Sequence, residues 1–95
     1  MKHLKTYNES LEKEEFGWIE EDNKLQKSLE FRDFNESLDF VNKLGVICES
    51  MNHHPEINWV YNKIKLTLST HDAGDKITDL DYQLANEING ILENI

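Results

Sequence analysis

Residues 49–71, ESMNHHPEINWVYNKIKLTLSTH, decide the fold because they hold a helix end, a proline and two strand patterns. Pro55 pushes the residue before it, His54, into extended geometry, so the helix that precedes this pair must end here. Residues 57–61 and 64–70 follow as two runs rich in residues that favour strands. In the second run, apolar side chains alternate with lysine, threonine and serine, which is typical of a strand with one buried face. The short polar turn between the runs predicts an antiparallel pair.

A helical pattern precedes this stretch and begins at Asp33 or Asn35. One apolar set recurs along it at helical spacing and consists of Phe34, Leu38, Val41, Cys48 and Met51. A second set, Phe40 and Ile47, lies off this stripe. Because a sheet face covers only one side of a helix, we expect the remaining apolar residues to form an exposed patch. Such a patch predicts self-association through a two-fold interface.

Two further strands are expected upstream of this helix. Residues 17–20 are predicted to form a short strand, residues 21–23 its turn, and residues 25–31 a second strand. The period of two in the second strand indicates one wetter face and one face made of Leu25, Lys27, Leu29 and Phe31. These two strands therefore form a second hairpin.

The N-terminal residues carry the weakest pattern. Residues 1–7 are expected to be a loose tail, followed by a short charged helix that starts at Asn8 or Ser10 and ends near Gly17. At the other end, Thr78 with an aspartate three residues later approximates a capping box that opens a last helix. The 95 residues are thus predicted to form one α+β domain. It would hold a four-stranded antiparallel sheet with helices packed on one face, in the order α-β-β-α-β-β-α.

The composition excludes several classes of partner. The formal net charge is −9, from 19 acidic and 10 basic residues. Nucleic acid and anionic membrane surfaces are bound by clustered Lys and Arg, so neither partner is expected, and a neutral ligand fits better than an anionic one. The single Cys48 cannot form an intrachain disulfide. No segment approaches the roughly 20 apolar residues of a membrane span, so we expect a cytoplasmic protein.

Three of the four histidines, His53, His54 and His71, lie in the quoted stretch. Antiparallel pairing of the two strands places His71, at the end of one, beside the other two at the start of its neighbour. Glu49 precedes His53 by one helical turn and could orient its ring, and Asp72 follows His71 directly. Because the unperturbed pKa of imidazole is about 6.5, these rings can both take up and release protons near neutral pH.

Three interpretations of the histidines are open: ordinary surface residues, a metal site, or proton transfer. Adjacent histidines in an extended segment point apart, so His53 and His54 cannot easily share one ion. The chain also has no H-x3-H or paired-cysteine spacing. The residues therefore favour general acid–base catalysis without a metal or a cofactor. Neither His53 nor His71 lies on a core stripe, so replacing either is expected to change stability little.

The spacing E-x3-H-H-P-x5-Y-x9-H-x9-D is the most specific pattern in the chain. It is formed by Glu49, His53, His54, Pro55, Tyr61, His71 and Asp81, and it resembles the pterin-4a-carbinolamine dehydratase family. The resemblance runs from Gly17-Trp18 to Leu84-Ala85 and covers most of the chain. The sequence departs from the family at Ile57, where an aromatic residue is common, and in the loop before Asp81, which is one residue longer than in animal members.

The resemblance implies dehydration of 4a-hydroxytetrahydropterin to quinonoid dihydropterin, which recycles the cofactor of aromatic amino acid hydroxylases. It implies no metal and no bound cofactor. It further implies that His53 and His71 act as acid and base, in an order the sequence leaves open, and that His54 binds or orients the pterin. The other residues expected to bind or orient the pterin are Glu49, Pro55, Asp72, Asp81 and Trp18.

The resemblance also implies that the protein forms dimers or tetramers. It further implies a second function, which belongs to a different class. In animals the same family doubles as a dimerisation cofactor for a homeodomain transcription factor. The alternative function is therefore a non-catalytic protein-interaction module of the same fold. Because His53, His54 and His71 are all present, we expect activity rather than a purely structural role.

Overall fold

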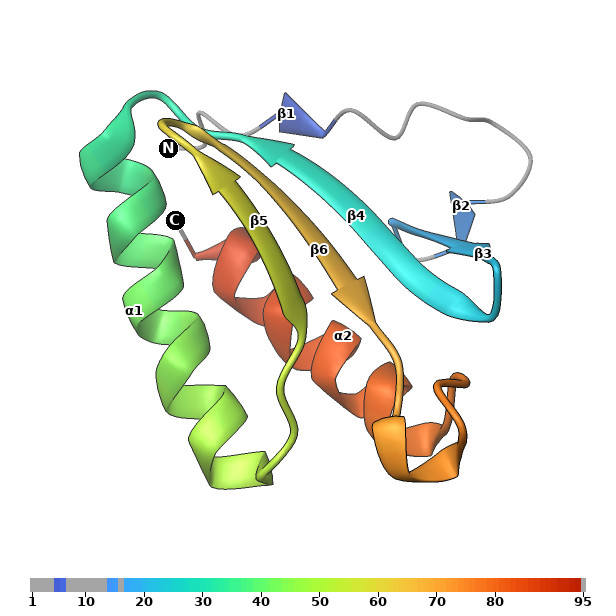
Figure 1. The fold of residues 1–95 in the computed structure, drawn as a ribbon. Helices are drawn as coiled ribbons and strands as arrows, with labels where there is room; N and C mark the ends of the chain where they lie inside the picture. The colour runs from blue at the N-terminus through green and yellow to red at the C-terminus, as the bar shows by residue number, and fades with distance from the viewer. Residues whose placement is uncertain (1–4, 7–13, 16, 95) are drawn as a thin grey trace.

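The computed structural model describes residues 5–6, 14–15 and 17–94. Four antiparallel strands form its central sheet, in the order β3 (Trp18–Glu21), β4 (Lys24–Glu30), β6 (Lys63–Leu68) and β5 (Glu56–Val60). The helices α1 (Phe34–Met51) and α2 (Asp79–Glu93) lie side by side on one face of this sheet (Figure 1). A single 3₁₀ turn, η1 (His71–Ala73), lies between β6 and α2. The predicted α+β class and the predicted sheet are confirmed.

Two very short strands extend the sheet and correct the prediction for the N-terminal residues. β1 (Lys5–Thr6) pairs with β4, so this part of the predicted loose tail is held by the sheet. β2 (Glu14–Glu15) pairs with β3, so these residues do not form the end of a helix. A strand at the edge of a sheet has backbone N–H and C=O groups without partners. A short extended segment can form hydrogen bonds with these groups. The rest of the predicted tail and helix, residues 1–4, 7–13 and 16, lies outside the described residues.

Both hairpins turn through residues in the left-handed region. Asp22 and Asn23, between β3 and β4, have φ of +56° and +60°, as a type I′ turn requires. Tyr61, between β5 and β6, has φ of +54°. The second turn is tied to the end of β4, because Asn62 Nδ2 donates to the carbonyl of Phe31 over 2.7 Å. The Asn62–Phe31 contact continues the antiparallel pairing of β4 with β6, in which Leu68 at the end of β6 lies opposite Leu25 near the start of β4.

Side-chain caps define the start of α1, and a left-handed residue defines its end. The Asp33 carboxylate accepts the N–H of Glu36 over 2.9 Å, and Glu36 Oε1 accepts the N–H of Arg32 over 2.6 Å. At the other end Asn52 adopts φ of +53°, and its N–H points back to the last carbonyls of the helix. The predicted helix end before Pro55 is confirmed. The left-handed residue turns the chain away from the helix axis before His53.

The buried face of α1 differs from the predicted stripe. It consists of Ser37, Phe40, Leu44 and Cys48. Phe40 is 0% exposed, so the prediction that it lies in a surface patch is wrong. The residues left at the surface are Phe34 and Leu38, which are 44% and 37% exposed, and Phe34 stacks on Trp59 of β5. The physical reason is that the side of α1 that carries Phe40 faces the sheet, where the Phe40 ring lies 5.2 Å from the Phe31 ring, centroid to centroid.

The core lies between the sheet and the two helices. Leu25, Lys27, Leu29 and Phe31 are all buried on the inner face, as the alternation predicts. Lys27 is accommodated there because its Nζ donates to the carbonyl of Gly17 over 2.6 Å and lies over the Trp18 ring. Among the described residues, no helix combines the length and the apolar character needed to cross a bilayer.

Candidate functional site

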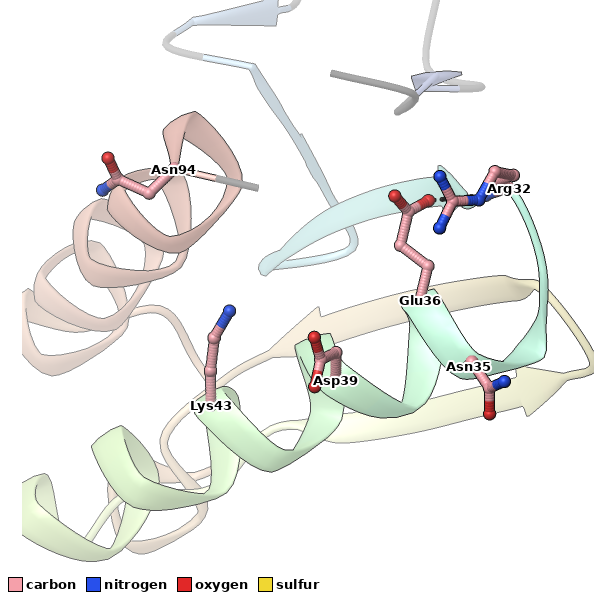
Figure 2. Close-up of a pocket in the computed structure, with 6 residues that line it drawn as sticks. All are labelled: Arg32, Asn35, Glu36, Asp39, Lys43 and Asn94. Carbon is pink, nitrogen blue, oxygen red and sulfur yellow. Dashed lines mark hydrogen bonds between the residues drawn. The ribbon is translucent and has the colours of Figure 1, made fainter. Parts of the chain in front are cut away.

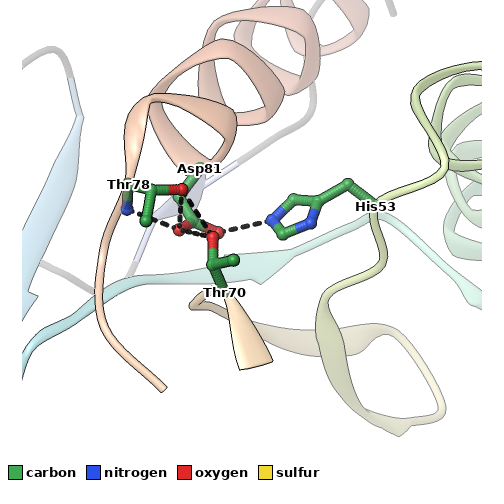
Figure 3. Close-up of polar contacts among 4 residues, drawn as sticks. All are labelled: His53, Thr70, Thr78 and Asp81. Carbon is green, nitrogen blue, oxygen red and sulfur yellow. Dashed lines mark hydrogen bonds and ion pairs between the residues drawn. The ribbon is translucent and has the colours of Figure 1, made fainter. Parts of the chain in front are cut away.

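Three segments that are distant in sequence meet at one end of the molecule. They are the turn after α1 that carries His53, the end of the β6 segment at Thr70, and the start of α2 at Thr78 and Asp81. Figure 1 shows the end of α1, the turn η1 and the start of α2 at the same end of the ribbon. Figure 3 shows the four side chains in contact. The antiparallel arrangement predicted from the strands therefore does bring the His53 and His71 segments to one end of the sheet.

Asp81 is the centre of this contact and is 0% exposed. Its Oδ1 lies 2.7 Å from Nε2 of His53. Its Oδ2 accepts the N–H of Thr78 over 2.9 Å and the hydroxyl of Thr70 over 2.7 Å. Both carboxylate oxygens are thus held by fixed groups. The sequence suggested two roles for Asp81, a helix cap and a site residue, and the geometry gives it both contacts at once.

His53 is 9% exposed, and its imidazole is fixed from one side only. Its Nε2 faces Asp81, while its other ring nitrogen points away from the network (Figure 3). Among the described residues, no side chain or backbone group forms a hydrogen bond with His53 Nδ1. One nitrogen is therefore anchored on Asp81, and the other forms no hydrogen bond with a described residue.

His54 pairs with the carboxylate that the sequence had assigned to His53. Its Nε2 lies 2.9 Å from Oε2 of Glu49, and both side chains are largely exposed, at 55% and 81%. The prediction that Glu49 orients His53 is therefore wrong. The left-handed turn at Asn52 takes His53 off the helical face on which Glu49 lies, and this turn cannot be read from helical spacing.

His71 lies in η1 and is the most exposed of the three rings, at 90% for its side chain. Its Nδ1 lies 3.2 Å from Oδ1 of Asp75, four residues later. Asp72, the carboxylate singled out from the sequence, is exposed and forms no hydrogen bond or ion pair with another described residue. The 3₁₀ turn points consecutive side chains in different directions, so the neighbour in sequence is not the neighbour in space.

Two other predicted site residues, Trp18 and Pro55, do not take part in the contact around Asp81. Trp18 is 1% exposed in the core, where its Nε1 donates to Asn89 Oδ1 over 2.9 Å. It therefore packs the fold and offers no surface to a substrate, which corrects its assignment as a binding residue. Pro55 is half-buried between His54 and the start of β5. Its contribution here is the extended backbone it imposes on His54.

The sequence reasoning missed Thr70, Thr78 as a partner of Thr70, and Asp75. The Thr70 and Thr78 hydroxyl oxygens lie 2.6 Å apart. The alternation along β6 carried a signal for Thr70, because Leu66 and Leu68 are buried and residue 70 continues the same face. Thr67 lies on the opposite face of the strand and lacks this signal.

A hollow between the start of α1 and the end of α2 is a second candidate (Figure 2). It is lined by Arg32, Asn35, Glu36, Asp39, Lys43 and Asn94. These are polar residues of both charge signs, most of them exposed. Because none of them is a buried group held in a fixed orientation, the hollow is less suited to proton transfer than the end of the molecule that carries the histidines.

Two other kinds of site, a metal centre and a reactive thiol, depend on particular side chains. Within the described part of the chain, no three His, Cys, Asp or Glu side chains gather closely enough to hold a metal ion. Cys48 is free and buried. Burial, followed by the charge of Glu49, raises the pKa of the Cys48 thiol, which therefore stays protonated and is a poor nucleophile at neutral pH.

Comparison with known proteins adds evidence independent of this geometry. The family described as Pterin 4 alpha carbinolamine dehydratase matches residues 3–91. A protein of Sulfurisphaera tokodaii, provisionally named pterin-4-alpha-carbinolamine dehydratase, is 47% identical over 76 residues, which cover 80% of this chain and 81% of that protein. A protein of Prochlorococcus marinus with the same provisional name is 47% identical over 77 residues, covering 81% and 79% of the two chains.

Solved structures are also similar to this fold. One is a transcriptional coactivator/pterin dehydratase from Brucella melitensis, with a TM-score of 0.75, 32% identity, and coverage of 80% of this chain and 82% of the other. Another is a pterin dehydratase-like protein described as a RuBisCO assembly factor in the alpha-carboxysome. It has a TM-score of 0.69 and 19% identity, and covers 80% and 89% of the two chains. At that identity the second likeness concerns the fold alone.

Proposed function

The chain belongs to the pterin 4 alpha carbinolamine dehydratase family, and from that premise we propose that it is a hydro-lyase that dehydrates 4a-hydroxytetrahydropterin to quinonoid dihydropterin. The observation that carries the proposal is His53, a buried imidazole with one nitrogen anchored on Asp81 and the other left available. The product would return to a pterin-dependent hydroxylase. The acidic chain gives no reason to propose a nucleic acid or membrane partner.

The reaction requires two proton transfers on one small molecule. The carbon–oxygen bond at position 4a breaks as the hydroxyl takes up a proton and leaves as water. A neighbouring ring nitrogen loses a proton, and its electron pair forms the new carbon–nitrogen double bond. An acid and a base that titrate near neutral pH can perform both transfers, and each contributes about 10²–10⁴ in rate. No redox step or group carrier is needed.

We assign the two transfers to His53 and His71 and the binding of the pterin to His54. His53 is rigid because Asp81 holds it. His71 is exposed on a short 3₁₀ turn and can adjust to a bound ligand. His54, paired with Glu49 at the surface, offers a polar edge with which a pterin ring can hydrogen-bond. Which of His53 and His71 is the acid follows from the pH dependence of variants of each, not from their position.

We further propose that catalysis needs neither a metal nor a bound cofactor. Each histidine in this region pairs with a different carboxylate, which separates potential metal ligands instead of gathering them. The experiment is exhaustive treatment with EDTA followed by the dehydration assay. Full activity is expected. Loss of activity that one divalent ion restores would move a metal mechanism to first place.

A homo-oligomer is also part of the proposal. β5 is an edge strand in the described sheet, and exposed apolar side chains lie on it and next to it: Phe34, Leu38, Ile57, Val60 and Tyr61. An edge of this kind can pair with a second copy of the chain. Leu38→Glu is expected to lower the mass measured by light scattering, whereas the control Val46→Glu, at a position that is 70% exposed on the same helix, should not. A monomeric parent protein would refute the oligomer.

The alternative is an interaction module of the same fold that has no enzymatic role. The exposed apolar surface beside β5 is the feature that favours it, since it is available to another protein as well as to a second copy. A dehydration assay on the purified protein with the 4a-carbinolamine separates the two functions. Turnover that depends on His53 and His71 supports the enzyme, and absence of turnover in the folded protein supports the module. As part of the enzyme proposal we place the protein in the cytoplasm.

A further inference from the structure

The hydroxyl of Thr70 occupies a central place in the buried contact, although the motif that contains the three histidines does not include it. Thr70 Oγ1 lies 2.7 Å from Asp81 Oδ2 and 2.6 Å from Thr78 Oγ1. Thr70 is also the residue directly before His71. Its backbone closes the loop that carries His71, because its carbonyl accepts the N–H groups of Ala73 and Asp75.

Counting protons fixes the direction of these bonds. The N–H of Thr78 can only donate, so Asp81 Oδ2 is an acceptor. Thr70 has one hydroxyl proton, which is best used on the Asp81 carboxylate because bonds to an ionised oxygen are the stronger ones. Thr78 must then donate its hydroxyl proton to Thr70 over 2.6 Å, since its own oxygen is 3.5 Å from Asp81. Two hydroxyls therefore line up toward one carboxylate.

The same count decides how His53 carries its proton. Asp81 Oδ1 is an acceptor, so the nitrogen that faces it over 2.7 Å, Nε2, must be the donor. In the neutral ring this leaves Nδ1 without a proton and able to accept one. Nδ1 is the nitrogen that points away from Asp81, Thr70 and Thr78 (Figure 3). The network thus presents the basic nitrogen of His53 to a ligand.

We propose that Thr70 is a positioning residue: its hydroxyl locks the Asp81 carboxylate so that His53 is held with its proton on Nε2 and Nδ1 is the nitrogen that exchanges protons with the substrate. This inference rests on the proposed dehydratase function. Through its backbone Thr70 also fixes the start of η1, so one residue sets the position of both reacting histidines. Thr70 itself does not touch the substrate.

The test compares three threonine variants. Thr70→Val has nearly the same shape but no hydroxyl, and it is expected to lower kcat by roughly tenfold to hundredfold, the usual cost of a slightly misplaced catalytic group, with KM nearly unchanged. Thr70→Ser keeps the hydroxyl and is expected to return kcat to near the parent value. Thr67→Val removes a hydroxyl from the same strand on the opposite face and should leave kcat unchanged. Circular dichroism and thermal unfolding check that each variant is folded.

A spectroscopic readout makes the inference independent of turnover. The ¹⁵N resonances of His53 in the labelled parent protein, without substrate, are expected to show a proton on Nε2 and none on Nδ1. Thr70→Val should weaken this preference, and Thr70→Ser should keep it. A neutral His53 ring that carries its proton on Nδ1 in the parent protein overturns the proposal, and this measurement holds even if Thr70→Val does not fold.

The two proposals fail in different ways. A folded parent protein that does not dehydrate the carbinolamine refutes the proposed function, whatever the state of His53. An active parent protein whose Thr70→Val variant retains full kcat refutes the role of Thr70 alone. Equal loss in Thr70→Val and Thr70→Ser would also refute it, because the hydroxyl would then not be the cause.

Discussion

The His53–Asp81 pair and the His71–Asp75 pair each join an imidazole to a carboxylate at hydrogen-bond distance, 2.7 Å and 3.2 Å. Their surroundings differ. The first pair has side-chain exposures of 10% and 0%, and its carboxylate is held by two further donors. The second has exposures of 90% and 58% and lies within one short turn. The same chemical contact therefore occurs in two different environments in one molecule.

The difference shows what burial adds to a contact between ionisable groups. An exposed pair competes with water and is worth about 0–1 kcal/mol, so His71 is only weakly held by Asp75. A buried carboxylate that loses its partner becomes an uncompensated charge, so the His53–Asp81 contact is hard to break even where its net contribution to stability is small. A site with one rigid and one adjustable imidazole can hold a small planar ligand and still follow it through two proton transfers.

The largest expected effect concerns activity, where the two histidines should not differ. His53→Gln and His71→Gln each remove a titrating ring and are expected to lower kcat for carbinolamine dehydration by roughly 10²–10⁴. Glutamine at position 53 keeps an N–H that can reach Asp81, so the fold should survive. His54→Gln is the matched control and should act mainly on KM. Parental kcat in both His53→Gln and His71→Gln would remove the acid–base assignment.

The second prediction concerns stability, to which the His53–Asp81 pair is expected to contribute more than the His71–Asp75 pair. Asp81→Ala leaves His53, Thr70 and the N-terminal turn of α2 without their acceptor and is expected to lower the free energy of unfolding by about 3–5 kcal/mol. Asp75→Ala should lower it by less than about 1 kcal/mol. Urea denaturation at pH 7 measures both. Equal losses would mean that burial does not distinguish the two contacts.

The sequence predicted much of this site because its strongest signals are local or periodic. Pro55 marked the end of α1, and the alternation along β6 marked the strand that ends beside His71. The Thr78–Asp81 capping box is present as predicted. The α+β class follows from the order of these elements, and it is confirmed by the structure.

Other features could not be predicted because they depend on single backbone angles or on packing against the sheet. The left-handed conformation of Asn52 turns the chain so that Glu49 pairs with His54 instead of His53. The rotation of α1 about its axis turns Phe40 toward Phe31 of the sheet and leaves Phe34 at the surface beside Trp59. For His53 the expectation that a replacement would cost little stability also needs correction, because its ring is buried against Asp81. Helical spacing gives no information on any of these points.

A smaller effect is expected at Glu49, whose carboxylate contacts the exposed ring of His54. Glu49→Gln breaks the His54 contact, whose two side chains are 55% and 81% exposed. Such a contact is worth less than about 1 kcal/mol, so KM should rise by roughly fivefold or less, with kcat nearly unchanged. Steady-state kinetics on the parent and the variant decide this. A hundredfold loss of kcat would instead place Glu49 in the proton transfer and make the His54 pair equivalent to the buried one.

The smallest effect is expected at Cys48, a buried thiol that forms no ion pair with another described residue, whereas the His53 ring lies against the Asp81 carboxylate. Burial, followed by the charge of Glu49, raises the pKa of the Cys48 thiol in the folded protein. The folded state therefore binds the thiol proton more tightly than the unfolded chain, in which the pKa is about 8.5. This contribution to stability is complete below that pKa and is lost as the pH rises from it toward the higher folded pKa.

Urea denaturation between pH 7 and pH 10 should accordingly show a steeper fall in the free energy of unfolding for the parent protein than for Cys48→Ala. The alanine variant lacks the titrating group, and although a smaller side chain lowers its stability at every pH, that cost does not depend on pH. The difference between the two pH profiles isolates the thiol. Parallel profiles over this range would mean that burial at Cys48 does not disfavour the thiolate, and that the contrast between partnered and unpartnered buried groups does not extend to this residue.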